Sequence, residues 1–262
     1  MELREAIGNR RSIRFLLPHK PVELEKIQCM LEAARIASHW GNINSLRALV
    51  IQRDEAPQDV IDALPSPVGG YQIQLAPVVI VWYVETDASD HAGPRVRELV
   101  EVGAVGYGDK KMEQVENTLV PMFANLGDAL KGPGMNEIDC GQGIAQATLM
   151  AFELGLGTCC MGSANFDAVR TKLGLPESCR VLVTQTVGYP AESPEAGGQR
   201  PRLPFEELFQ LNGYDNPFPR SKEVVEQLKK DRMLQRQAPI PWREAELLYL
   251  RQALDLKGEG LI

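Results

Sequence analysis

A continuous apolar run, Pro77-Val-Val-Ile-Val-Trp-Tyr-Val84, constrains the fold of this chain more than any other segment. Its residues are mostly β-branched or aromatic, which favours a strand. The run is far shorter than the ~20 apolar residues that a membrane helix needs. Because its pattern is continuous and not alternating, it is typical of a strand that is buried on both faces. The run therefore predicts a central strand of a sheet.

Segments with helical spacing are mixed with further strands on both sides of this run. Helices are predicted at residues 3–8, 24–34, 59–64, 138–154, 222–235 and 242–256. Strands are predicted at residues 48–51 and 180–188. Residues 87–134 have an irregular pattern, with a glycine-rich patch at 103–108 and a helix around 112–130. This mixture predicts an α/β or α+β layer fold.

The composition is that of an ordinary globular protein, with 44% hydrophobic and 24% charged residues. The net charge of −7 argues against non-specific binding to nucleic acid. The N-terminal sequence lacks the apolar core of a signal peptide, and the five cysteines form no C-x-x-C pair. We therefore expect a cytoplasmic protein with reduced thiols and with neither a nucleic-acid nor a membrane partner.

Two arginine-rich segments are the first candidates for a binding site. Arg10-Arg11-Ser12-Ile13-Arg14 places three guanidinium groups within five residues, beside a hydroxyl group. In the second segment, Arg200 and Arg202 flank Pro201 after a predicted strand. Guanidinium groups make bidentate, charge-assisted contacts to phosphate, and alternating side chains would present Arg10, Ser12 and Arg14 to one ligand. Each segment alone is also interpretable as a solvated basic turn, so convergence of the two on one phosphate would be the informative result.

Two further segments combine polar groups and glycines. Ser38-His-Trp-Gly-Asn-Ile-Asn-Ser45 is rich in groups that pair with the edge of a heterocycle, although it is equally interpretable as a capping and turn segment. Gly155-Leu-Gly-Thr-Cys-Cys-Met-Gly-Ser163 ends the long apolar helix, and Gly157 suits a helix C-terminus. We expect Cys159 and Cys160 to be packing residues in preference to redox-active ones.

Several common site signatures are absent from the sequence. Its glycines do not form the G-x-G-x-x-G pattern of dinucleotide-binding folds, and it contains no P-loop and no G-x-S-x-G elbow. Its three histidines lack metal-ligand spacing, so we expect no metal site.

Taken in order, these segments resemble the nitroreductase family over residues 1 to about 210. The opening A-I-x-x-R-R-S-I-R-F is similar to that of the family almost position for position. Residues 32–44 resemble its E-A-A-R-x-A-P-S-x-x-N-x-Q segment, and residues 155–162 resemble G-L-G-T-C-W-M-G. Leu75-Ala-Pro77 with its strand resembles A-P-V-x-I-V, and Val187-Gly-Tyr-Pro190 with the second arginine pair resembles the late phosphate-binding segment.

The resemblance implies a fold, a cofactor and a set of site residues. The fold would be a dimeric α+β three-layer α-β-α sandwich with a mainly antiparallel sheet. FMN would bind at the subunit interface, with NAD(P)H as the electron donor. Arg10, Arg11, Ser12, Arg14, Arg200 and Arg202 would hold the ribityl chain and phosphate. The backbone of Met161 and Gly162 would lie beside the flavin, and Asn42 and Asn44 would reach it from the partner subunit.

The sequence also departs from the family pattern. Ser38-His39 replaces Pro-Ser, so that His39 is a new titratable group near the expected flavin and a possible modulator of it. Two residues are inserted after Gly162, around residues 163–165. We expect a FMN-binding domain at residues 1–216, with an insert at about 87–134, and a C-terminal helical extension at 217–262.

The implied reaction is reduction of an electron-poor small molecule, of the nitroaromatic or quinone type, by NAD(P)H in a ping-pong mechanism. Two alternatives stay open. One is a specialised flavin oxidase, dehydrogenase or reductive dehalogenase of the same superfamily. The other is a non-catalytic flavin-binding dimer.

Overall fold

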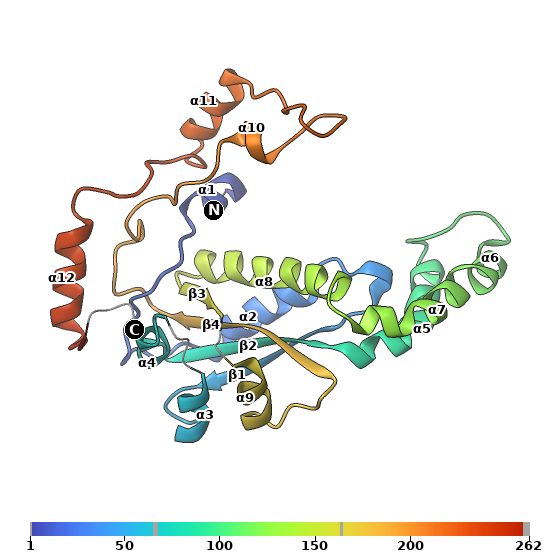
Figure 1. The fold of residues 1–262 in the computed structure, drawn as a ribbon, viewed down its shortest axis with the longest axis horizontal. Helices are drawn as coiled ribbons and strands as arrows, with labels where there is room; N and C mark the ends of the chain where they lie inside the picture. The colour runs from blue at the N-terminus through green and yellow to red at the C-terminus, as the bar shows by residue number, and fades with distance from the viewer. Residues whose placement is uncertain (1, 65–67, 163–164, 259–262) are drawn as a thin grey trace.

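Four antiparallel strands form a sheet at the centre of the computed structural model, which describes residues 2–64, 68–162 and 165–258 (Figure 1). The strands are β1 (Leu46–Gln52), β2 (Val78–Glu85), β3 (Gly157–Met161) and β4 (Cys179–Gly188). Their order across the sheet is β1-β2-β4-β3. The apolar run is therefore an interior strand, β2, as its composition predicts.

Helices cover both faces of this sheet, which makes three layers. Helices α2 (Leu24–Arg35) and α8 (Met135–Glu153) pack on one face, and α3 (Gln58–Ala63), α4 (Tyr71–Leu75) and α9 (Phe166–Lys172) pack on the other (Figure 1). In β2, Val78, Ile80 and Trp82 lie in the core beneath α2 and α8, whereas Val79 and Val81 lie in the opposite core. The α+β three-layer sandwich with an antiparallel sheet is thus confirmed.

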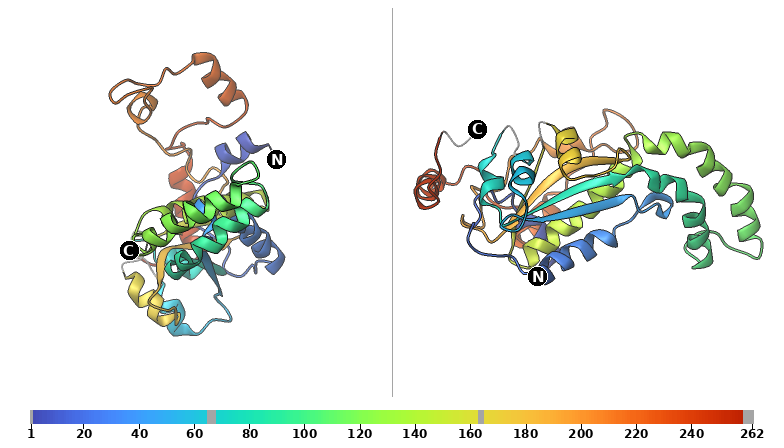
Figure 2. Two further views of the ribbon diagram at one scale, coloured as in Figure 1. Left: turned by 90° about the vertical axis from the view of Figure 1, so that its right-hand side faces the viewer. Right: turned by 90° about the horizontal axis from the view of Figure 1, so that it is seen from below.

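Residues 86–131 form a helical lobe beyond one end of the sheet (Figure 2). Its elements are the short helix η2 (Thr86–His91) and the helices α5 (Ala92–Glu101), α6 (Lys111–Asn117) and α7 (Leu119–Lys131). The sequence pattern of this region is irregular, but the structure is regular and helical. Val96 and Val100 of α5 form a small core with Val115 and Phe123. The single helix expected around residues 112–130 is two helices, which meet at Thr118 with φ −126° and ψ −65°. Pro121 lies in the first turn of α7, where the missing amide donor costs no helical hydrogen bond.

The assignment of Gly157 to a helix C-terminus is also wrong. Helix α8 ends at Glu153, and Gly155, with φ +76°, makes the left-handed turn that follows it. Gly157 begins β3. A Cβ atom there would lie 2.7 Å from Cγ2 of Ile13, so glycine is required because the N-terminal segment passes directly over the strand.

The C-terminal tail returns to the N-terminus of its own chain. It contains α10 (Phe205–Leu208), α11 (Lys222–Lys230) and α12 (Arg243–Ala253), so the two helices predicted in the tail are present but shorter. Residues 231–235 contact α1 (Leu3–Asn9) through the pairs Arg4–Asp231 and Arg232–Glu5. Leu250 of α12 is buried against Phe15. In the described ranges, no helix is both long and apolar enough to cross a membrane.

Candidate functional site

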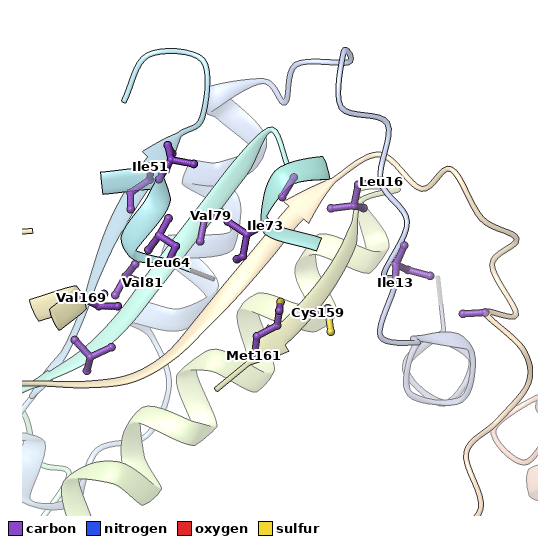
Figure 3. Close-up of a cluster of buried hydrophobic side chains, with 14 residues drawn as sticks. Ile13, Leu16, Ile51, Leu64, Ile73, Val79, Val81, Cys159, Met161 and Val169 are labelled. Atoms are coloured by element: carbon purple, nitrogen blue, oxygen red, sulfur yellow. The ribbon is translucent and has the colours of Figure 1, made fainter. Parts of the chain in front are cut away.

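The first arginine segment is fixed to the edge of the sheet by its apolar residues. The amide of Ile13 donates a hydrogen bond of 2.9 Å to the carbonyl of Thr158 in β3, and Ser12 pairs with the same residue in a parallel bridge. Ile13 and Leu16 are buried in the core with Met161 and Cys159 (Figure 3). Arg10, Ser12 and Arg14 alternate with buried neighbours and stay half-exposed, as the alternation predicts.

The structure brings the two arginine segments together. Arg200 and Arg202 face Arg10, Arg11 and Ser12 across a groove of about 610 Å³. The remaining lining residues are Ile7, Gln199, Leu203, Pro204, Phe205, Leu208, Phe209, Arg220, Leu234 and Gln237. No aspartate or glutamate lines this groove, which we call the arginine groove. Arg14 does not line the groove, but it is close enough to perturb Arg200 electrostatically.

Two carboxylates lie near these arginines without pairing with them: Glu192 acts to raise the pKa of Arg200, and Glu195 that of Arg11. Within the described ranges, no ion pair is formed by Arg10, Arg11, Arg14, Arg200 or Arg202. Burial, followed by repulsion from Arg10 and Arg200, lowers the pKa of Arg11. Burial, followed by repulsion from Arg14 and Arg243, lowers the pKa of Arg200. A cluster of mutually repelling guanidinium groups without ion-pair partners is suited to bind a phosphate.

Arg11 differs from the other arginines because its side chain is already engaged by the protein. It is 7% exposed and donates hydrogen bonds to the carbonyls of Gly8 and Arg10 and to the side chain of Gln235. Its Nε is buried without a partner in the described part of the chain. Arg11 therefore forms the floor of the groove and links it to the tail.

The end of β3 offers open backbone at Gly162. Met161 is buried in the core, and its carbonyl accepts a hydrogen bond of 3.1 Å from the Thr184 hydroxyl. Gly162 is exposed, and a Cβ atom there would meet none of the described residues within 4 Å. A flat ligand could therefore approach the backbone of Gly162 closely. Of the insertion expected around residues 163–165, residues 163 and 164 lie outside the described residues.

The polar loop has an unusual backbone. Trp40–Asn42 forms a single 3₁₀ turn, η1, and Gly41, Asn42 and Asn44 all have φ between +56° and +57°. Asn44 Nδ2 lies 3.0 Å from Asn42 Oδ1, and the Trp40 amide donates to Asp139 of α8 over 2.7 Å. Asparagine tolerates the left-handed region better than most residues, which explains its use here.

The helical lobe holds this loop from outside. The Phe123 ring of α7 lies 4.6 Å from the Trp40 ring, and Asn42 Nδ2 lies 3.5 Å from a carboxylate oxygen of Glu98 in α5. His39 is half-buried, and its Nδ1 has no partner in the described ranges. Burial lowers the pKa of His39, with Arg47 acting in the same direction and Asp139 against it. At neutral pH His39 is therefore a neutral side chain.

The structure does not bring the polar loop to the arginine groove within one chain. Trp40 contacts the first turn of α8 at Asp139, whereas Arg10 and Arg11 lie against Phe152 near the helix C-terminus. The 13 residues from Asp139 to Phe152 span roughly 20 Å of helix. Within one chain, the polar loop and the arginine groove are therefore two separate clusters of candidate residues.

Sequence reasoning missed a buried carboxylate next to the arginines. Glu192 is 5% exposed, accepts hydrogen bonds from the amides of Arg14 and Phe15, and forms an ion pair with Arg243 of α12. The sequence feature that could have identified Glu192 is its position. It lies two residues after the Gly188-Tyr-Pro190 turn and between the two arginine segments.

Of the two cysteines expected to be packing residues, Cys159 is buried in the core, whereas Cys160 is exposed on β3. Burial raises the pKa of Cys159. Desolvation of the thiol raises the pKa of Cys160 to about 11 although the residue as a whole is exposed, so both thiols stay protonated near neutral pH. No group of three or more potential metal ligands occurs among the described residues.

Comparison with known proteins identifies relatives. The sequence profile of the nitroreductase family matches residues 7–189. A protein of Thermus thermophilus named NADH dehydrogenase is 30% identical over 210 residues, which cover 79% of this chain and 95% of that protein. A protein of Staphylococcus haemolyticus named NADPH-dependent oxidoreductase is 31% identical over 106 residues, which cover 40% of this chain and 42% of that protein.

A solved structure shares the fold. The complex with FMN described as a nitroreductase of Exiguobacterium sibiricum has a TM-score of 0.64 at 23% identity. The match covers 81% of this chain and 98% of that one. At this level of identity the likeness concerns the fold.

Proposed function

This chain belongs to the nitroreductase family, which confirms the oxidoreductase class expected from its motifs, and we propose that it uses FMN and NAD(P)H to reduce an electron-poor acceptor. The acceptor would be of the nitroaromatic or quinone type. The observation that carries the proposal is the arginine groove. Two segments about 190 residues apart in sequence meet there, and their guanidinium groups have no carboxylate among the lining residues.

The residues present fit the phosphate of FMN. An FMN phosphate carries nearly two negative charges near pH 7, and the groove supplies Arg10, Arg200 and Arg202 around it, with Arg14 close by. Ser12 adds a hydroxyl donor on the same face. Arg11 contributes from the floor of the groove, where its buried Nε still lacks a partner in the described part of the chain. Each of these groups would hold the phosphate and the ribityl chain.

Two of the remaining site residues would require a second subunit. Met161 and Gly162 would lie beside the flavin ring of the same chain, where Gly162 leaves open space. Asn42 and Asn44 lie at the other end of α8, so they would reach that ring only from a partner subunit. We therefore propose a homodimer with two equivalent sites at its interface, consistent with family resemblance.

When bound, FMN supplies the two-electron chemistry between NAD(P)H and the acceptor in a ping-pong sequence. The residues of the chain would bind the cofactor and orient the flavin ring or the substrate. The arginines anchor the phosphate, and the Asn42 loop, held by Phe123 and Glu98, would orient the ring or the substrate. His39 is neutral near pH 7, so it would modulate the site through hydrogen bonding and not through charge.

The experiment is anaerobic stopped-flow mixing of the FMN-loaded protein with NADH or NADPH. We expect rapid loss of the flavin absorbance and, in a second step, its recovery on addition of a quinone. A purified protein that does not take up FMN would refute the proposal. No bleaching by either nucleotide would favour the specialised oxidase, dehydrogenase or dehalogenase, whereas bleaching without turnover by any acceptor would favour a non-catalytic flavin binder.

A further inference from the structure

Glu192 places a negative charge directly behind the arginine groove. Its side chain has 0% exposure. Its Oε1 accepts hydrogen bonds from the backbone amides of Arg14 and Phe15, the latter over 3.1 Å. The carboxylate therefore fixes the backbone from which Arg14 projects. Without a counter-charge, it would also repel any phosphate held by that arginine.

Arg243 of α12 supplies that counter-charge from the C-terminal tail. Its Nη2 lies 2.7 Å from Glu192 Oε2, an ion pair whose alignment falls outside that of a hydrogen bond. Its Nη1 lies 2.8 Å from Glu246 Oε2, and Glu246 in turn accepts a hydrogen bond of 2.6 Å from the Ser193 amide. The Arg243 side chain is only 14% exposed, so water screens these pairs weakly.

We propose that Arg243 is a positioning residue for the arginine groove, because it neutralises Glu192 and lets this carboxylate hold the Arg14 backbone without repelling the cofactor phosphate. The proposal rests on the proposed binding of FMN. It assigns the C-terminal tail a role in cofactor affinity, although α12 itself does not line the groove in the described ranges.

Two further observations place these charges within reach of the groove. Glu192 and Arg243 both act on the pKa of Arg200, the first raising it and the second lowering it. The Arg243 guanidinium also lies 5.9 Å from the ring of Phe15, next to Arg14 in the chain. Glu192 and Arg243 are therefore close enough to Arg14 and Arg200 for their charges to interact.

Helix α12 is held to the core by apolar contacts, so the role of Arg243 can be tested without unfolding the tail. Leu250 is 2% exposed and packs with Phe15 and Leu75, contacts that do not depend on the charge of Arg243. An Arg243→Gln variant should therefore keep α12 in place. Arg251→Gln is the matched control, because Arg251 lies exposed on the same helix.

The test measures dissociation constants of FMN and riboflavin, which differ only in the phosphate. For Arg243→Gln we expect the Kd of FMN to rise about tenfold or more and that of riboflavin to change less than twofold. Arg243→Lys should retain most of the FMN affinity, since it keeps the charge. Arg251→Gln should match the wild type. The double variant Glu192→Gln/Arg243→Gln should regain much of the lost affinity, because it removes the uncompensated charge.

Three results would overturn the inference. Equal weakening of FMN and riboflavin would show that Arg243 only holds the tail in place. Unchanged FMN affinity in Arg243→Gln would show that Glu192 does not act on the phosphate. Equal loss in Arg243→Lys and Arg243→Gln would show that charge is not the relevant property. A wild-type protein that binds no FMN would instead refute the proposed function.

Discussion

A substitution at Gly41 tests the contact between the polar loop and the helical lobe. A Cβ atom there would lie 2.6 Å from Cζ of Phe123, and the backbone has φ +57°. For Gly41→Ala, the left-handed backbone costs about 1–2 kcal/mol and the clash with a buried ring about 1–3 kcal/mol more. Gly103→Ala is the matched control, because Gly103 has φ +76° but a Cβ atom there meets nothing within 4 Å. It should cost about 1–2 kcal/mol, the backbone contribution alone.

The clash can be isolated by a double-mutant cycle in urea. Phe123→Ala alone should lower the free energy of unfolding by about 3–5 kcal/mol, since Phe123 is 5% exposed in the core of the lobe. In that background Gly41→Ala should cost no more than Gly103→Ala does in the wild type. A coupling of about 1–3 kcal/mol between positions 41 and 123 is therefore expected. Additive effects, or equal costs for the two glycine variants, would refute the claim that Phe123 holds the loop.

Three other predictions concern the remaining site residues. Arg14→Gln or Arg200→Gln should each weaken FMN binding about 10- to 100-fold in a fluorescence titration, with riboflavin unaffected, because a hydrogen bond to a charged group contributes about 1.5–3 kcal/mol. The pKa of His39 is lowered by burial in the folded state, so wild-type stability should fall relative to His39→Gln as the pH drops below about 6.5, and a pH-independent difference would contradict this. With its pKa raised to about 11, the Cys160 thiol should be alkylated at pH 7.5 about 300-fold more slowly than an ordinary thiol, as followed by mass spectrometry.

The sequence predicted those parts of the fold in which local pattern and tertiary environment agree. The uninterrupted β-branched run became an interior strand because both of its faces are covered. The alternation of Arg10, Ser12 and Arg14 is present because the residues between them, Arg11 and Ile13, are buried. The arginine residues themselves were identifiable from charge and spacing.

Tertiary contacts decided what the sequence could not. Gly157 suits a helix terminus locally, but its actual requirement is the approach of Ile13, which is 144 residues away in the sequence. The helices of the lobe are short, with at most 13 residues each, and are stabilised by packing around Phe123 and Val100. Arg243 gave no local signal at all, because its partner, Glu192, lies in a different part of the chain. Whether Asn42 reaches a flavin depends on a second subunit and stays a prediction.

The return of the tail to α1 has a consequence for the order of events in the cell. The arginine groove draws on residues near position 10, near position 200 and, through Gln237, on the region that precedes α12. At about 5–20 residues per second, a ribosome adds the segments near positions 10 and 200 roughly 10–40 s apart, and the segment at Gln237 follows them. A nascent chain therefore holds the sheet before it holds the groove. Cofactor loading should therefore follow the synthesis of residues 199–237, and a chain interrupted before α12 should fold its core yet bind FMN weakly.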